Sequence, residues 1–314
     1  MKTSGQDTSV INPASMAQYA IAAFVFLIGL AFGSFLNVCI YRIPRQKSVV
    51  LPASACPQCG AAIRAYDNVP VFSWLLLGGK CRNCRARISP RYIIVEALTA
   101  LLFLASYLHA NSMAEAFKLC LFSFLVLGLI FIDAEHHLLP DKLTLPGLAA
   151  GLAFSLLVPV EGILPYMDRI AHPSLLWLVN SLLGAAFGAL FIYAAGEIYF
   201  RMRGVHGMGF GDVKLMAMVG AYLGIKLTLL TILLASCLGT LFGVALMLAV
   251  WRKRVMRRMR SNPRPQDIYS RSWQSAQLML RAYEVPFGVF LGSMALVSLF
   301  AGDPMIHWYM SLFR

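Results

Sequence analysis

The sequence predicts an all-α, polytopic membrane protein with about eight transmembrane helices and a small, zinc-ribbon-like loop domain in the cytoplasm. Apolar residues make up 59% of the chain and charged residues only 13%, and the mean hydropathy is +0.70. Soluble globular domains contain about 45–50% apolar and about 25% charged residues. Basic residues gather between alternate apolar runs, and four cysteines lie in the longest polar stretch. These observations exclude an ordinary soluble domain.

Apolar runs account for the predicted helices, and most approach the ~20 residues needed to cross a hydrocarbon core. The first run should remain in the mature protein, because the N-terminus lacks the basic region and cleavage site of a secretory signal. The sixth run is short and ends beside Lys226, so its length alone does not establish a complete crossing. The eight runs cover residues 19–40, 93–108, 116–132, 143–160, 175–198, 213–225, 227–250 and 285–301.

Lysine and arginine residues set the predicted orientation, because they accumulate in cytoplasmic loops. The pattern places both termini in the periplasm. The same clusters face anionic lipid headgroups in this arrangement, which accounts for the net charge of +13. Nucleic-acid binding is not predicted, because no aromatic platform interleaves the basic residues. Most of the basic residues fall in segments 41–92 and 251–284, and the other alternate loops hold Lys142, Arg201, Arg203 and Lys214.

The predicted domain organisation follows from these spans. Residues 1–18 form a periplasmic segment, residues 19–40 the first transmembrane helix and residues 41–92 a cytoplasmic zinc-binding loop. Residues 93–314 form a membrane core of seven helices, with a basic cytoplasmic loop at 251–284 before the last helix. The lipid bilayer is therefore the first predicted partner of this chain.

Four cysteines in two CxxC pairs predict a structural zinc site. Each CxxC turn brings two thiolates close together, and the intervening residues 60–80 can form a hairpin that joins the pairs. A disulfide framework or a thioredoxin-like redox motif is the alternative, but a loop in the reducing cytosol keeps its thiols free and favours metal. Four thiolates leave no open coordination position, so a catalytic zinc is not expected. The ligands are Cys56, Cys59, Cys81 and Cys84.

Two aspartates lie at the ends of apolar runs, where a carboxylate is costly and is a functional candidate by default. Asp133 closes the third run, and Asp212 follows the flexible turn that contains Gly209 and Gly211. Both lie at the predicted cytoplasmic boundary, so the two carboxylates can meet. Two adjacent carboxylates do not both ionise easily, and such a pair can activate water for attack on an amide. The structural alternative is that each aspartate caps a helix or pairs with a lysine, Lys142 or Lys214.

Other polar residues near the membrane surface are assigned weaker roles. Asp141 follows Pro140, which prevents a continuous helix through this turn, and begins the fourth run. Glu96 lies one turn into the second run, either as a residue that reaches the interface or as part of a polar site. His136 and His137 lack the HExxH spacing of a metal site and are interpreted as an interfacial polar turn.

An ordered series of motifs over nearly the whole chain resembles the type IV prepilin peptidase family. The first motifs lie around the cysteine pairs, at 33–44, 67–75, 79–81, 88–92 and Glu96, and the last are Ile132-Asp133 to Leu-Pro-Asp141 and Gly209-x-Gly-Asp212-x-Lys214. The latter resemble the core of the GxGD aspartic proteases. The resemblance implies a bacterial inner-membrane enzyme that cleaves the basic leader from prepilins or pseudopilins at the cytoplasmic face. It also implies N-methylation of the exposed residue from S-adenosylmethionine.

The resemblance assigns roles residue by residue. Asp133 and Asp212 match the catalytic aspartates, and the four loop cysteines match a zinc-binding tetrad. Asp141 matches a supporting acidic position, and Gly209, Gly211 and Lys214 complete the second motif. Gly79 and Lys80 lie in a stretch associated with methyl transfer, where Glu96 or Asp67 could keep the amine deprotonated.

The chain also departs from the family pattern. Segments 161–174 and 252–281 are long, and Val289 stands in the motif where Phe-Gly-Pro-Phe-Leu is usual. The departures concern substrate docking and partners and leave the catalytic motifs intact. Two other classes of protein remain open: a transporter or channel that uses the aspartates for cations or protons, and a membrane scaffold whose zinc ribbon recruits a partner.

Overall fold

The structure is a computed structural model that describes residues 13–162, 172–204, 209–261, 268–281 and 286–313. Parts of the expected segments 1–18, 161–174 and 251–284 lie outside these residues. The chain divides into two compact units, Met1–Phe124 and Leu125–Arg314. All elements of regular structure in the described residues are helical, which confirms the all-α prediction.

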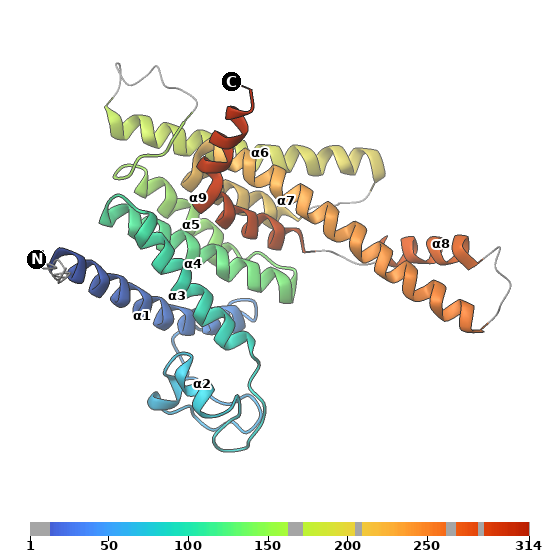
Figure 1. Cartoon of the computed structure of the whole chain (residues 1–314), viewed down its shortest axis with the longest axis horizontal. Helices are drawn as coiled ribbons and strands as arrows, with labels where there is room; N and C mark the ends of the chain where they lie inside the picture. The colour runs from blue at the N-terminus through green and yellow to red at the C-terminus, as the bar shows by residue number, and fades with distance from the viewer. Residues whose placement is uncertain (1–12, 163–171, 205–208, 262–267, 282–285, 314) are drawn as a thin grey trace, which may run out of the picture. The chain divides into compact units, whose positions relative to one another are not determined.

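The first unit is built on two long helices, α1 (Pro13–Arg42) and α3 (Arg91–His109), which run side by side (Figure 1). Their backbones come close at Gly33, where a Cβ atom would lie 2.6 Å from Cα of Glu96. Small residues permit such close packing between membrane helices. The side-chain amide of Asn37 also donates to the carbonyl of Tyr92 at 3.0 Å. These contacts fix the start of α3 beside the end of α1.

The loop between α1 and α3 contains little regular structure. It holds the 3₁₀ helix η1 (Ala65–Asn68) and the short helix α2 (Phe72–Leu76). Two isolated antiparallel bridges, Ala55 with Ala62 and Lys80 with Arg87, each enclose one CxxC pair. The predicted loop domain is therefore two cysteine turns joined by η1 and α2.

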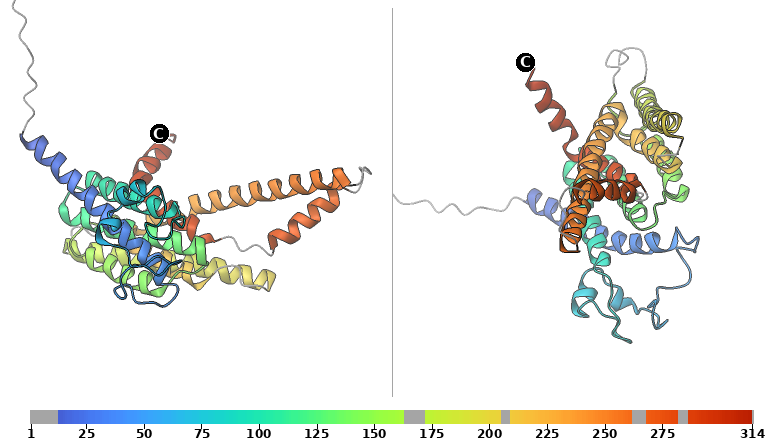
Figure 2. Two further views of the ribbon diagram at one scale, coloured as in Figure 1. Left: turned by 90° about the horizontal axis from the view of Figure 1, so that it is seen from below. Right: turned by 90° about the vertical axis from the view of Figure 1, so that its right-hand side faces the viewer.

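The second unit contains the rest of α4 (Met113–His136), whose first part belongs to the first unit, and five further helices. Helix α7 (Phe210–Ser261) is its centre, because it packs against the other four (Figures 1 and 2). These are α5 (Asp141–Phe154), α6 (Pro173–Arg203), α8 (Ile268–Arg281) and α9 (Phe287–Ser311).

Helix α7 is broken at Gly224, whose φ of 71° and ψ of 179° are not helical. A positive φ is accessible to glycine without steric cost. Backbone carbonyls near the break are satisfied by hydroxyls: Thr228 Oγ1 donates to Gly224 at 2.6 Å, and Ser181 Oγ donates to Ala221 at 2.6 Å. Such compensation is required where a helix is interrupted at membrane depth. The break falls near the end of the sixth predicted run, residues 213–225.

Six helices of the described chain are long and apolar enough to cross a membrane: α1, α3, α4, α6, α7 and α9. Two of the eight expected runs form shorter segments. Helix α5 has 14 residues, and the part of α7 before Gly224 is similarly short. At 1.5 Å per residue, such a segment spans roughly 21 Å, less than the ~30 Å hydrocarbon core. The short sixth run is thus a half-length helix that ends at a backbone break.

Candidate active sites

Asp133 lies in the last turn of α4 and is bound by the beginning of α9. Its carboxylate accepts a hydrogen bond from the backbone N–H of Val289 at 3.0 Å, and the N–H of Gly288 is also a donor. Gly288 packs directly against this carboxylate, since a Cβ atom there would lie 2.7 Å from Oδ2 of Asp133. The side chain is buried, with 6% of the residue surface exposed.

Asp212 lies in the first turn of α7, after the glycine turn predicted from the sequence. Its backbone N–H donates to the carbonyl of Gly209 at 3.1 Å, and its side chain accepts a hydrogen bond from the backbone of Gly209. Gly211 packs against Leu139, because a Cβ atom at Gly211 would lie 2.8 Å from Cβ of Leu139. Asp212 is buried, with 8% of its surface exposed.

The structure brings Asp133 and Asp212 close enough for their charges to interact. Leu139 packs against a glycine beside each aspartate. Its Cβ atom lies next to Gly211, and its Cδ1 atom lies next to Gly288. Two buried carboxyl groups whose charges interact do not ionise equally. One can accept a proton from water while the other donates a proton to a carbonyl oxygen. The arrangement is therefore suited to general acid–base attack of water on an amide.

Asp141 and Lys214 form an ion pair beside the aspartates. Nζ of Lys214 donates to Oδ1 of Asp141 at 2.6 Å and lies 5.2 Å from the ring centroid of Phe210. The pair connects the first turn of α5 to the first turn of α7. Lys214 thus binds Asp141, and this contact differs from the predicted alternative in which the lysine pairs with a member of the aspartate dyad.

Replacing Gly211 with alanine should strongly reduce any activity that depends on Asp212. The added Cβ atom would meet Leu139 at 2.8 Å and must displace the start of α7 or the turn before α5. A displacement of about 1 Å in a catalytic group costs on the order of a hundredfold in rate.

Gly243→Ala is the matched control for this change, because no described atom lies within 4 Å of a Cβ atom placed at Gly243. Rates of peptide cleavage should be compared at equal amounts of folded protein. Equal rates for Gly211→Ala and Gly243→Ala would contradict the packing argument.

The four loop cysteines form one cluster whose sulfur atoms all lie within 4.8 Å of one another. A tetrahedral site with metal–sulfur bonds of ~2.3 Å has sulfur–sulfur edges of about 3.8 Å, and Sγ of Cys56 lies 3.8 Å from Sγ of Cys84. All seven cysteines are free thiols, so no described pair forms a disulfide. The spacing fits a single metal ion held by four sulfurs.

Backbone N–H groups in the cysteine turns favour the thiolates of Cys59 and Cys81, whereas burial and hydrogen bonds with the neighbouring cysteines raise the pKa of Cys84 to about 11. The N–H of Ala61 lowers the pKa of Cys59 to about 7, and the N–H groups of Cys84 and Asn83 lower the pKa of Cys81. Both turns have the same hydrogen bonds, from the first cysteine N–H to the carbonyl of Ala61 or Ala86. Metal ions bind deprotonated sulfur, so this donor set is suited to a cation.

A cavity of about 810 Å³ lies in the first unit between the ends of α1 and α3 and the loop. Its volume falls within the range of small-molecule sites, roughly 300–1,000 Å³. Buried Glu96 lines it and accepts a hydrogen bond from the N–H of Val71 at 2.7 Å. Aromatic side chains of Tyr41, Trp74 and Tyr92 also line it. Arg45 and Arg91 already lie over the rings of Tyr41 and Tyr92, at 4.2 and 5.2 Å from the ring centroids, so Trp74 and Glu96 are the lining groups suited to a cationic ligand.

Val71 is held in a strained backbone conformation above this cavity. Its φ of 63° and ψ of −55°, with a hydrogen bond of 2.6 Å from the N–H of Phe72 to the carbonyl of Pro70, define a γ-turn. This form of γ-turn is rare and strained, and positive φ is exceptional for a β-branched residue. Strained residues persist where their surroundings fix them, often at functional sites. The hydrogen bond from the Val71 N–H to the carboxylate of Glu96 holds Val71 in this conformation.

The structure separates the three residues linked to methyl transfer. Glu96 lines the cavity, whereas Gly79 supports Trp74 from behind, since a Cβ atom there would lie 2.8 Å from Cζ2 of the indole. Gly79 has a φ of +64°, which favours glycine. Lys80 is exposed and is not among the described lining residues.

Asp67 is engaged by Arg82 through a bidentate contact, with Nε at 2.9 Å and Nη2 at 2.6 Å. This hydrogen bonding lowers the pKa of Asp67. The ion pair therefore connects η1 to the second cysteine turn. Because its pKa is lowered, Asp67 is a poor proton acceptor. Of the two carboxylates considered for amine deprotonation, the structure favours Glu96.

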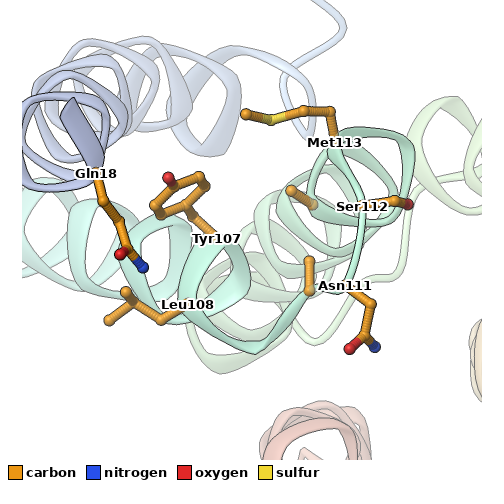
Figure 3. A pocket seen from close by; sticks show the side chains of 8 residues that line it. Gln18, Tyr107, Leu108, Asn111, Ser112 and Met113 are labelled. Atoms are coloured by element: carbon orange, nitrogen blue, oxygen red, sulfur yellow. The ribbon is translucent and has the colours of Figure 1, made fainter. Parts of the chain in front are cut away.

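A second cavity in the first unit, of about 280 Å³, lies at the other end of α3 (Figure 3). It is lined by Gln18, Tyr107 and the turn that leads into α4, including Asn111 and Met113. Its described lining residues include no carboxylate, histidine or cysteine. It offers no group for either reaction.

Sequence reasoning identified the two aspartates and the cysteines but missed the contribution of α9. Pro286 followed by an apolar run was a signal that a helix begins there. Nothing in that pattern indicated that the first turn would contact Asp133. Val71 was also missed, although a proline followed by a β-branched residue lies within the loop motif.

Comparison with known proteins gives two family profiles that together cover most of the chain. Residues 27–110 match the bacterial peptidase A24 N-terminal domain, and residues 119–244 match the type IV leader peptidase family. No solved structure matches the chain.

Relatives named prepilin leader peptidase/N-methyltransferase are similar over most of their length. The relative from Aeromonas salmonicida is 32% identical, over 92% of this chain and 94% of its own. The relative from Pseudomonas aeruginosa is 36% identical, over 73% of this chain and 81% of its own. The relative from Myxococcus xanthus is 37% identical, over 74% of this chain and 64% of its own.

Proposed function

This chain belongs to the type IV leader peptidase family, and we propose that it removes the basic leader from prepilins or pseudopilins and then methylates the exposed amine. The observation that carries this proposal is the meeting of Asp133 and Asp212 at one buried site. The transporter and scaffold alternatives receive no support from these relatives, which are named as peptidases and methyltransferases.

Leader cleavage uses the two aspartates as base and acid. The ionised carboxylate takes a proton from water as the water oxygen bonds to the carbonyl carbon of the scissile peptide. The protonated carboxyl donates to the carbonyl oxygen. The group that took the proton from water then gives it to the nitrogen as the C–N bond breaks, and the hydroxyl of the intermediate returns its proton to the other carboxylate as the C=O bond re-forms. The products are the leader, with a free carboxyl group, and a new α-amine. Gly288 allows the backbone of α9 to approach Asp133 closely, and Gly211 allows the start of α7 to pack on Leu139.

The methyl-transfer step is assigned to the 810 Å³ cavity of the first unit. S-adenosylmethionine supplies an electrophilic methyl group on a sulfonium when bound there. Trp74 would hold this cation by its ring face, and the carboxylate of Glu96 would offset its charge. Glu96 would accept the proton that the α-amine loses, so that the nitrogen lone pair is free to bond to the methyl carbon. Gly79 acts indirectly by supporting Trp74.

The cysteine cluster would hold one zinc ion with a structural role. Four sulfurs complete a tetrahedral shell and leave no position for substrate. The cluster lies in the loop that also supplies the cavity, and Cys56 and Cys81 are among the cavity-lining residues. Zinc would therefore stabilise the walls of the methyl-transfer site.

The enzyme is assigned to the bacterial inner membrane, with both sites facing the cytoplasm and both termini in the periplasm. Basic residues support this orientation, because α1 ends at Arg42 and α6 ends with Arg201 and Arg203. Both aspartates lie at helix ends on the side predicted to be cytoplasmic. A basic leader remains on that side of the membrane by the same charge rule.

Variants of Glu96 test whether the cavity is the methyl-transfer site. Wild-type protein in detergent, given a prepilin peptide and S-adenosylmethionine, should yield a cleaved product with one added methyl group. Glu96→Gln keeps an acceptor oxygen for the N–H of Val71 but removes the charge. We expect it to lower methylation by about 10²-fold or more while leader cleavage continues, as measured by mass spectrometry.

Glu96→Ala is the companion variant, because it removes both the charge and the hydrogen bond to Val71. If Glu96→Gln methylates as the wild type does and only Glu96→Ala is inactive, the carboxylate acts as a structural contact and not as a base. If neither variant changes methylation, the cavity is not the methyl-transfer site.

A further inference from the structure

The N-terminus of α9 meets Asp133 through the backbone N–H of Val289. Helix α9 begins at Phe287 after Pro286, and its N-cap side chain makes no hydrogen bond to the first turn. The N–H groups of a first helical turn have no partner within the helix. Here the carboxylate of Asp133 accepts one of them, from Val289 at 3.0 Å. A proline at position 289 would have no N–H to donate.

Several groups face Asp133, and they act differently on its charge. His137, one turn further along the chain, lies close enough for its charge to act on Asp133. Asp212 of α7 presents a second negative charge. Helix α9 contributes the N–H groups of Gly288 and Val289, and its positive N-terminal dipole favours an anion. Leu139 contributes only apolar atoms.

The two aspartates differ in these contacts. Asp133 accepts hydrogen bonds from two backbone N–H groups at the start of a long helix. Asp212 accepts one from Gly209, within its own turn. Hydrogen bonds to the charged form of a carboxyl group favour that form. The negative charge of the pair is therefore better stabilised on Asp133.

We propose that the Val289 N–H is a positioning group that keeps Asp133 ionised, so that Asp133 is the base that activates water and Asp212 is the proton-bearing acid. This inference rests on the proposed leader-peptidase function. Val289 acts through Asp133 and does not itself contact the reacting atoms. The backbone N–H of Val289, and not its side chain, stabilises the charge on Asp133.

Val289→Pro tests the proposal, because it deletes the N–H at a position where helices accept proline. Residue 289 lies in the first turn of α9, where the missing N–H makes no intrahelical bond. Val289→Ala is the matched control, since it shortens the side chain and keeps the donor. Replacing residue 289 by the α-hydroxy acid of valine, which exchanges N–H for an ester oxygen, removes the donor without proline.

The measurement is the pH dependence of leader cleavage for the full-length protein in detergent. Loss of one hydrogen bond to a charged group should move the acidic limb of the profile to higher pH by about one unit. At a fixed pH on that limb, cleavage should fall about tenfold. The proline and ester variants should both show the shift, and Val289→Ala should not. Methylation of an already cleaved peptide should be unchanged in all three, which shows that the first unit is folded, and thermal unfolding at the wild-type temperature would show that the second unit is folded.

Two outcomes would overturn the assignment. An unchanged profile in the proline and ester variants would show that the Val289 N–H does not control Asp133. A shift confined to the alkaline limb would show that Asp133 is the acid, with the roles reversed. Failure of the leader-peptidase function is a separate result, because it would appear as no leader cleavage by the wild-type protein.

Discussion

Asp133→Asn and Asp212→Asn should each abolish leader cleavage, with losses on the order of 10³-fold or more. Asparagine is nearly isosteric with aspartate and keeps an acceptor oxygen, so the hydrogen bond from Val289 can persist. What each variant loses is the ability to take up or release a proton. The two losses should not add in the double variant, because the aspartates act as a unit. The assay is cleavage of a prepilin peptide followed by mass spectrometry.

Asp141→Asn is the control for this experiment. It lies near the pair and binds Lys214, but it is not a member of the dyad. The exposed side chain of Asp141 contributes little through its ion pair, about 0–1 kcal/mol. Its substitution should therefore slow cleavage only modestly. All three variants should still methylate a peptide whose leader is already removed. Near-wild-type cleavage by either dyad variant would exclude the dyad mechanism.

Removing one cysteine of the cluster should release the metal and abolish methyl transfer. Cys81→Ser replaces a sulfur ligand that also lines the cavity. Structural zinc contributes directly to folding, with apparent binding free energies of about 10–16 kcal/mol in small zinc domains. We expect about one zinc ion per chain in the wild type and little in the variant, as measured by elemental analysis of protein purified without oxygen.

Cys237→Ser provides the control, because Cys237 is a free thiol in α7 and not a member of the cluster. It should retain both zinc and methylation. Leader cleavage by Cys81→Ser should be reduced less than methylation, because the aspartates belong to the other unit of the chain. Full methylation by a zinc-free variant would show that the metal does not maintain the cavity. Wild-type protein without metal would refute the zinc assignment itself.

The membrane helices were predictable because each reflects a local property of the chain. A run of apolar residues is stable in hydrocarbon only when its own backbone groups are paired, so composition alone indicates a helix. The extent of crossing was less predictable. The runs at 143–160 and 213–225 became short segments, α5 and the part of α7 before Gly224. Their lengths depend on turns and on contacts with other helices.

The cysteine cluster was predictable for a related reason. Sulfur spacing within each CxxC turn is a local constraint, and a single metal ion is the simplest way to satisfy both turns. The cavity beside it was not predictable. It depends on how Glu96 from α3 reaches Val71 in the loop, and this contact joins residues 25 positions apart.

By itself, the sequence determined the helical membrane class, the four-cysteine cluster and the two aspartates that form the candidate dyad. These depend on side-chain chemistry, which the sequence records directly. Only the tertiary structure decided that the Val71 N–H donates to Glu96 and that the first turn of α9 donates to Asp133. Both contacts use backbone N–H groups, which every residue except proline carries. A donor of this kind leaves no residue-specific pattern, and folding alone determines which carboxylate it meets.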